Sequence, residues 1–254
     1  MSFNRYFIKL SYKGTHFHGW QIQPNGVTIQ GEITKALRLI LKQPDLSIVG
    51  AGRTDTGVHA KVFYAHVDFQ SPIASTGDLV FKLNRFLPSD IAIHDIFEVK
   101  PDAHSRFDAQ SREYHYFINQ HKDSFSKETS WYLYGNLNVN LMNAAAARLL
   151  SYTDFTSFSK LHTQVKNNIC RIDEAQWKQN GDKLVFTIKA DRFLRNMVRA
   201  IVGTLVEIGK GKLSIEEFEH IIQSKDRRRA GESAPAQGLF LWDIKYDFDK
   251  IISN

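Results

Sequence analysis

The chain has 254 residues, 43% of them hydrophobic, and its 33 Lys and Arg against 27 Asp and Glu give a net charge of +6. This composition excludes a disordered chain, and a single cysteine, Cys170, excludes an internal disulfide and a Cys-based zinc site. The N-terminus lacks a signal-peptide core and no run approaches the roughly 18 apolar residues of a membrane span, so we expect a cytoplasmic protein without a membrane partner. The positive charge favours a polyanionic partner such as nucleic acid.

The first third of the chain alternates strands with a helix. RYFIKLSY, residues 5–12, is predicted as a strand that ends in a glycine-bearing loop. Apolar residues then recur at helical spacing over 29–41, with Thr28 as a candidate N-cap. LSIVG (46–50) and KVFYAHVDF (61–69) are predicted strands, so the glycine-rich motif between them connects two strands.

The later part of the chain continues this alternation. A strand is predicted over 111–119 and an Ala-rich helix over 141–150. Asn180-Gly181 indicates the turn of a hairpin between strands at 173–179 and 183–190. Ser214 and Glu217 have the spacing of a capping box at the start of a last helix.

A strongly apolar helix is predicted from Leu194 to Val206, closed by glycines at 209 and 211. At 100° per residue, Arg192, Arg195 and Arg199 fall along one flank of its stripe, where they could reach an anion. The alternative is three solvated arginines on a surface helix. A second basic run, 227–229, is interpreted as a solvated loop.

The motif GAGRTDTGVH, residues 50–59, places a carboxylate in a bend that glycines make easy. Arg53, backbone amides and the hydroxyls of Thr54 and Thr56 would keep Asp55 ionised, because opposite charge and hydrogen bonds favour the anion. A fixed, ionised aspartate can act as a nucleophile or a base. The alternative is an aspartate that closes a turn on its own backbone.

Seven ordered stretches resemble the tRNA pseudouridine synthase A family. They are YKGTHFHGWQIQ (12–23), GAGRTDTGVHA (50–60), LNRFLPSDIAI (83–93), SRFDAQSREYHYFI (105–118), DFTSFSK (154–160), FLRNMVRAIVGTLVEIGKG (193–211) and APAQGLFLW (234–242). The resemblance implies an α+β pseudouridine synthase fold. Two sheet-bearing α/β halves, 1–105 with the catalytic Asp loop and 106–254 with the active-site Tyr and Arg, would form a mixed, mainly antiparallel sheet. Helices would pack on that sheet, and a central active-site cleft would separate the halves.

The resemblance also implies a role for each matching residue. Asp55 matches the catalytic aspartate, Tyr114 the tyrosine that packs on the flipped base, and Arg199 the basic partner of the carboxylate. Leu239 matches an apolar pocket wall, and Arg53 an arginine that enters the RNA stack when the target uridine leaves it. Arg192 and Arg195 are further candidates for phosphate binding.

The reaction implied is the isomerisation of uridine to pseudouridine at positions 38, 39 and 40 of the tRNA anticodon arm. The uracil leaves ribose at N1 and rejoins through C5, so no cofactor and no metal is expected. His16 and His18 could suggest a metal site, but no further metal ligand lies near them in the sequence. Whether Asp55 adds to C1′, adds to C6 or abstracts a ribose proton stays open. The family further implies a homodimer whose two subunits both contact one tRNA.

Two other functions are compatible with parts of the sequence. A non-catalytic RNA-binding or RNA-chaperone protein could use the basic surface alone. An aspartic protease also uses Asp-Thr-Gly, but it needs two such aspartates in one site, and this chain has one such triplet. Formation of pseudouridine in unmodified tRNA separates both from the synthase.

Overall fold

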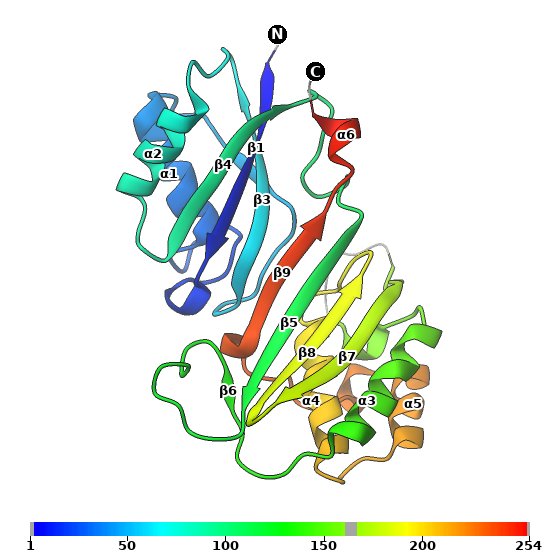
Figure 1. The fold of residues 1–254 in the computed structure, drawn as a ribbon. Helices are drawn as coiled ribbons and strands as arrows, with labels where there is room; N and C mark the ends of the chain where they lie inside the picture. Colours follow the sequence, from blue (N-terminus) through cyan, green and yellow to red (C-terminus); the bar gives the residue numbers. More distant parts are fainter. Residues whose placement is uncertain (1–2, 161–166, 253–254) are drawn as a thin grey trace. The chain divides into compact units, whose positions relative to one another are not determined.

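The structure is a computed structural model that describes residues 3–160 and 167–252 (Figure 1). It contains two compact units, the first formed by 1–110 with 241–254 and the second by 111–240. The C-terminal segment therefore belongs to the first unit. The predicted division of roles between 1–105 and 106–254 stays a prediction.

Four strands in the N-terminal part of the first unit pair with one another. They are β1 (Asn4–Tyr12), β2 (Ile48–Gly50), β3 (His59–Phe69) and β4 (Ile91–Val99). The order is β4-β1-β3, with β2 paired to β3, and these pairs are antiparallel. The predicted strands at 5–12, 46–50 and 61–69 are confirmed, whereas β4 was not predicted.

Two helices lie on one side of this sheet, α1 (Ile29–Leu41) and α2 (Thr76–Phe86) (Figure 1). The predicted cap is confirmed, because the Thr28 hydroxyl accepts from the Gly31 amide over 3.2 Å. Lys42 terminates the helix after Leu41, because it adopts a left-handed conformation with φ 54°. The second helix, α2, was not predicted; Ser75 caps its start.

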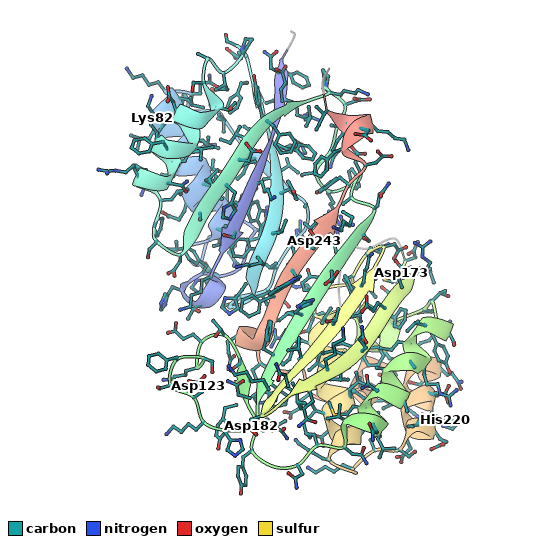
Figure 2. All side chains as sticks on the ribbon, viewed as in Figure 1. Lys82, Asp123, Asp173, Asp182, His220 and Asp243 are labelled. Atoms are coloured by element: carbon teal, nitrogen blue, oxygen red, sulfur yellow. The ribbon has the colours of Figure 1, made fainter. Side chains whose placement is uncertain are left out.

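The second unit contains the antiparallel strands β5 (Ser111–Asn119), β8 (Lys183–Ala190) and β7 (Ile172–Asn180), in that order, and β6 (Trp131–Tyr132) runs parallel to β5. The predicted hairpin is confirmed, but its turn lies one residue later than the predicted Asn180-Gly181, because Asn180 still pairs with Lys183. Its turn consists of Gly181, with φ +58°, and Asp182 (Figure 2). The α+β class with a mixed, mainly antiparallel sheet is thus confirmed.

Three helices pack in the second unit: α3 (Val139–Arg148), α4 (Met197–Gly209) and α5 (Ile215–Ser224). Nearly every residue of α4 is buried, as its apolar sequence indicates. The predicted capping box of α5 is confirmed, since the Ser214 hydroxyl and the Glu217 carboxylate each accept from the other residue's amide.

The chain returns from the second unit to the first through β9 (Leu239–Lys245), which leads to the short helix α6 (Phe248–Ile251). Neither element was predicted. In the part of the chain that the structure describes, no helix combines the length and hydropathy that crossing a membrane requires.

Candidate active site

Asp55 lies in the loop that connects β2 to β3, residues 51–58. Gly57 has a φ of +78°, and the Val58 amide donates to the Asp55 carbonyl over 3.2 Å. A tight turn therefore follows the aspartate, and glycine permits it because it adopts a positive φ without steric cost. Asp55 itself is half-buried. The backbone thus fixes the carboxylate-bearing residue without covering it completely.

The segment 12–20 supports this loop from below the surface. The Tyr12 hydroxyl and the Thr54 Oγ1 form a buried hydrogen bond of 2.8 Å, and the Trp20 amide donates to the Thr54 carbonyl over 3.3 Å. Gly19, with φ +82°, lies so close that a Cβ there would overlap the Thr54 carbonyl oxygen. Trp20 is 1% exposed and stacks on Phe63 of β3 at 4.1 Å between ring centroids. The loop therefore rests on the core of the first unit.

Arg53 is exposed on the same loop, two residues before Asp55. Its Nε donates to the Gln21 Oε1 over 3.2 Å. Gln21 thus orients a guanidinium whose planar face can stack on a base and whose charge can bind phosphate.

Tyr114 and Tyr116 project from the same face of β5, where they pair with Ile188 and Phe186 of β8. Tyr116 is fully buried, and its hydroxyl donates to the Pro235 carbonyl over 2.8 Å. Burial raises the pKa of Tyr116, although the positive charge of Arg199 opposes that effect. Tyr114 is only partly buried and meets Phe193 edge-on at 5.0 Å between ring centroids. Of the two rings, Tyr114 is the more accessible.

Arg199 lies in the first turn of α4 and is half-buried. Its Nε donates to the Ala234 carbonyl over 2.7 Å, and the Ala234 amide donates back to the Arg199 carbonyl over 2.9 Å. This reciprocal pair holds the arginine against the segment that leads to β9. Arg199 also lies near enough to Tyr116 for its positive charge to oppose the rise in the pKa of that tyrosine.

The prediction that Arg192, Arg195 and Arg199 share one helix flank is wrong. Helix α4 begins at Met197, because Asn196 has φ 66° and a left-handed residue cannot continue a right-handed helix. Arg192 is half-buried, and its Nη1 donates to the Asn167 Oδ1 over 3.3 Å. Arg195 is exposed in the turn before the helix. Only Arg199 lies on α4.

Leu239 is the first residue of β9 and is 5% exposed. Gly238 precedes it, and a Cβ on Gly238 would overlap the ring of Tyr116. The Leu239 side chain is therefore buried, and the chain just before it passes close to the ring of Tyr116.

A family model described as tRNA pseudouridine synthase matches residues 9–108 and 145–247. These ranges cover more than half of the chain and contain every candidate residue except Tyr114. The chain belongs to the tRNA pseudouridine synthase family. Members of this family are isomerases, so the protein is an enzyme that converts uridine to pseudouridine in tRNA.

Relatives of the same family agree over nearly the full length. The chain is 56% identical to the tRNA pseudouridine synthase A of Parabacteroides distasonis over 95% of this chain and 96% of that one. It is 52% identical to the protein of the same name from Bacteroides fragilis, over 97% of this chain and 98% of that one. The Bacillus subtilis protein of that name is 39% identical over 94% and 97%. These names support neither an aspartic protease nor an RNA chaperone.

A solved structure of the CRISPR endoribonuclease Cse3 bound to a 19 nt RNA also aligns with the chain. The alignment covers 91% of this chain and 100% of that one, with 12% sequence identity and a TM-score of 0.24. This similarity is too weak to carry an argument.

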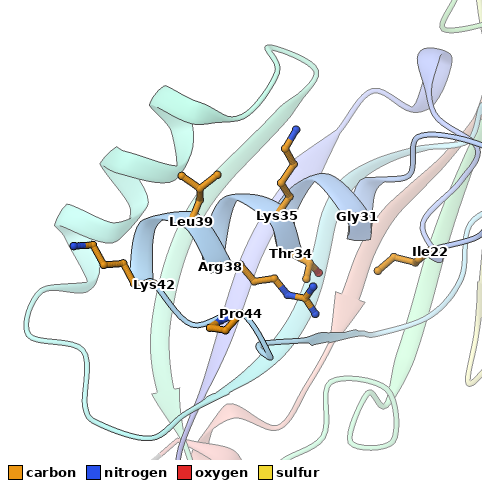
Figure 3. A pocket seen from close by; sticks show the side chains of 8 residues that line it. All are labelled: Ile22, Gly31, Thr34, Lys35, Arg38, Leu39, Lys42 and Pro44. Carbon is orange, nitrogen blue, oxygen red and sulfur yellow. The ribbon is translucent and has the colours of Figure 1, made fainter.

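Within the residues described, no group of three or more His, Cys, Asp and Glu side chains is placed to hold a metal ion. Cys170 is buried, and burial raises the pKa of its thiol to about 12. A groove of about 600 Å³ runs along the outer face of α1 between Ile22 and Pro44 (Figure 3). None of the predicted site residues lines it.

Sequence reasoning missed the residues that position the site. Tyr12, Gly19 and Trp20 belong to a quoted motif, but the motif does not say that they support the loop of Asp55. Gln21 follows them directly, and nothing in its neighbourhood in the sequence links it to Arg53. The contacts join positions more than 30 residues apart, which no local pattern predicts.

Proposed function

We propose that this synthase modifies uridines 38, 39 and 40 of the tRNA anticodon arm and that Asp55 is its catalytic group. The observation that carries the proposal is the anchoring of Asp55. Its loop is tied by hydrogen bonds to the segment 12–20, within a range that the family model matches. A carboxylate that must meet one atom of a mobile nucleotide needs such a rigid support.

The chemistry breaks the N1–C1′ bond, turns the uracil within the site and forms a C5–C1′ bond. All non-hydrogen atoms stay in the product; C5 loses its proton and N1 gains one, so the composition is unchanged. Asp55 serves as nucleophile or base, with addition to C1′, addition to C6 and abstraction of a ribose proton as the three routes. Tyr114 packs on the base, Leu239 lines the apolar side of the site, and Arg199 supplies a positive charge.

Access to a stacked uridine requires its extrusion, which costs a few kcal/mol. Arg53 is our candidate for the vacated place in the stack, because Gln21 orients its planar group at the surface. Arg192 and Arg195 contribute phosphate contacts separately, since they do not share a helix face with Arg199. An enzyme that accepts three neighbouring uridines meets different flanking bases at each one. We therefore expect it to recognise the shape of the tRNA and not the flanking bases.

The test is product formation on an unmodified tRNA transcript, with pseudouridine mapped by position. Wild-type protein should modify uridines 38, 39 and 40, and Asp55→Asn should retain tRNA binding but leave less than about a thousandth of the turnover. Asp45→Asn, at an exposed loop position of the same unit, is the matched control. Modification of a single anticodon-arm uridine or of ribosomal RNA would refute the target, and turnover by Asp55→Asn would refute the catalytic assignment.

We further propose that the protein acts in the cytoplasm as a homodimer, with one tRNA contacting both subunits. Sedimentation equilibrium should give twice the chain mass, and tRNA should bind with fewer than one molecule per chain. A monomer with full activity would refute the dimer and leave the reaction assignment intact.

A further inference from the structure

The arginine run 227–229 does not behave as the solvated loop that its sequence suggests. Arg228 is exposed and pairs with the neighbouring Asp226, and Arg229 is exposed as well. Arg227 is different: it is half-buried and its guanidinium donates to three oxygens of the following loop. The acceptors are the Ala230 carbonyl at 3.3 Å, the Gly231 carbonyl at 3.2 Å and the Ser233 Oγ at 3.0 Å.

The loop 230–235 that Arg227 holds is pressed onto α4. The Gly231 amide donates to the Thr204 Oγ1 over 3.0 Å, and the Asn196 Nδ2 donates to the Ser233 Oγ over 2.6 Å. Gly203 leaves room for this contact, because a Cβ there would overlap the Glu232 carbonyl oxygen. Ser233 thus receives donors from both sides, and the loop has little freedom to shift.

The far end of the same loop binds Arg199 of the proposed site and the buried Tyr116. The Ala234 carbonyl accepts from the Arg199 Nε over 2.7 Å, and the Pro235 carbonyl accepts from the Tyr116 hydroxyl over 2.8 Å. A change in the path of the loop therefore moves the Ala234 carbonyl, which accepts from the Arg199 guanidinium. Arg227 lies at the start of this chain of contacts, and Arg199 lies at its end.

We propose that Arg227 is a positioning residue, which sets the orientation of Arg199 by clamping the loop 230–235. The inference rests on the proposed role of Arg199 in the reaction. The fork of a guanidinium reaches three acceptors at once, which a lysine ammonium at the same place cannot match in geometry. Arg227 itself does not touch the substrate.

Single-turnover reactions on tRNA transcript test the proposal with Arg227→Ala, Arg227→Lys and the matched control Arg228→Ala. Arg227→Ala should lower the rate constant by about tenfold to a hundredfold while the Kd for tRNA changes less than about threefold, because misplaced groups cost turnover more than binding. The rate constant of Arg227→Lys should lie between those of Arg227→Ala and wild type. The rate constant of Arg228→Ala should equal that of wild type. Equal rates for Arg227→Ala and Arg228→Ala, measured on protein that is folded by circular dichroism, would overturn the proposal.

A double variant separates positioning from a general loss of stability. If Arg227 acts through Arg199, then Arg227→Ala should slow the Arg199→Lys enzyme far less than it slows wild type. Fully multiplicative losses would overturn the proposal, since they would mean independent effects. An Arg199→Lys enzyme as fast as wild type would instead refute the proposed role of Arg199, whatever Arg227 does.

Discussion

At the scale of single residues, side chains of the same type differ in role because they differ in burial and in hydrogen-bond partners. Tyr114 and Tyr116 share a face of β5, yet Tyr116 is fully buried and bonded to Pro235, whereas Tyr114 stays partly accessible. Likewise Arg227 supports a loop, and its neighbour Arg228 pairs with an aspartate at the surface. The members of each pair have the same side chain, so only their three-dimensional surroundings distinguish their roles.

The first prediction concerns Arg53. Arg53→Lys keeps the charge but loses the planar group, so turnover should fall at least about tenfold while tRNA affinity falls less than about tenfold, or roughly 1.4 kcal/mol. Single-turnover kinetics and filter binding measure the two quantities. Arg85→Lys, at an exposed position on α2, is the control. Near-normal turnover in Arg53→Lys would show that charge alone suffices.

The second prediction concerns His66, which is 5% exposed and accepts the Ser105 amide at Nδ1 over 3.2 Å. Burial, then the charges of Arg5 and His104, lower its pKa from 6.5 to about 4, against weaker opposing effects of Asp68 and Asp108. The unfolded state therefore binds the proton first. Neutral His66 therefore contributes its full share to the free energy of unfolding above about pH 6.5. As the pH falls towards 4, this free energy decreases by at most about 3 kcal/mol.

Urea unfolding at pH 7.5 and pH 4.5 measures this dependence. In His66→Gln, whose amide oxygen can still accept, the loss between the two pH values should shrink by about 1 kcal/mol or more. His121→Gln is the control, because that side chain is 73% exposed. An unchanged pH dependence in His66→Gln would assign the effect to other groups.

At the scale of elements, two loops matter for the proposed site: one bears Asp55, the other is bonded to Arg199, and both are held by neighbouring segments. The loop 51–58 depends on the segment 12–20, and the loop 230–235 depends on α4. In both places a glycine allows the close approach of two backbones. The elements therefore act on the reaction by fixing where these loops run.

The third prediction tests this dependence at Gly19. Gly19→Ala must adopt a φ of +82° and place a methyl group on the Thr54 carbonyl, so the Asp55 loop should shift. We expect turnover to fall about tenfold or more and the free energy of unfolding to fall by about 1–3 kcal/mol. Gly77→Ala on α2 is the control, since its Cβ would have no neighbour within 4 Å. Equal turnover in the two variants would mean that the loop tolerates displacement.

At the scale of the whole molecule, we expect the protein to need only its own side chains and a polyanionic substrate. The net charge of +6 suits a tRNA partner, and isomerisation transfers no electrons. Among the described residues no cluster of ligands is arranged for a metal ion. Cys170 lies buried in the second unit with a thiol pKa of about 12, so it is not a ready nucleophile.

The fourth prediction concerns the removal of metal ions. Protein treated with a chelator and desalted should keep turnover within about twofold when assayed on tRNA folded beforehand in magnesium, because a reaction without electron or group transfer needs no carrier. Parallel reactions with added zinc serve as the comparison. Activity that is lost and returns only with zinc would reveal a metal site.

Local patterns were enough to predict the strongly periodic elements and the residues that match the family. The helix of 29–41, the hairpin around Gly181 and the capping box of Ser214 follow from local spacing and turn chemistry, which act over a few residues. The resemblance placed Asp55, Tyr114 and Arg199 on the chain by motif alone. Short elements such as β6 and α6 lack enough residues to show a period, so they were missed.

The start of α4 and the residues that hold the loops depend on contacts between segments far apart in the sequence. The helical period continues through Leu194, but the left-handed Asn196 and its bond to Ser233 start the helix at Met197, and Arg192 and Arg195 leave its face. The clamp of Arg227 on the loop before β9 is likewise absent from any local pattern. Such contacts depend on which distant segments meet when the chain buries its apolar residues, and spacing along the sequence does not contain that information.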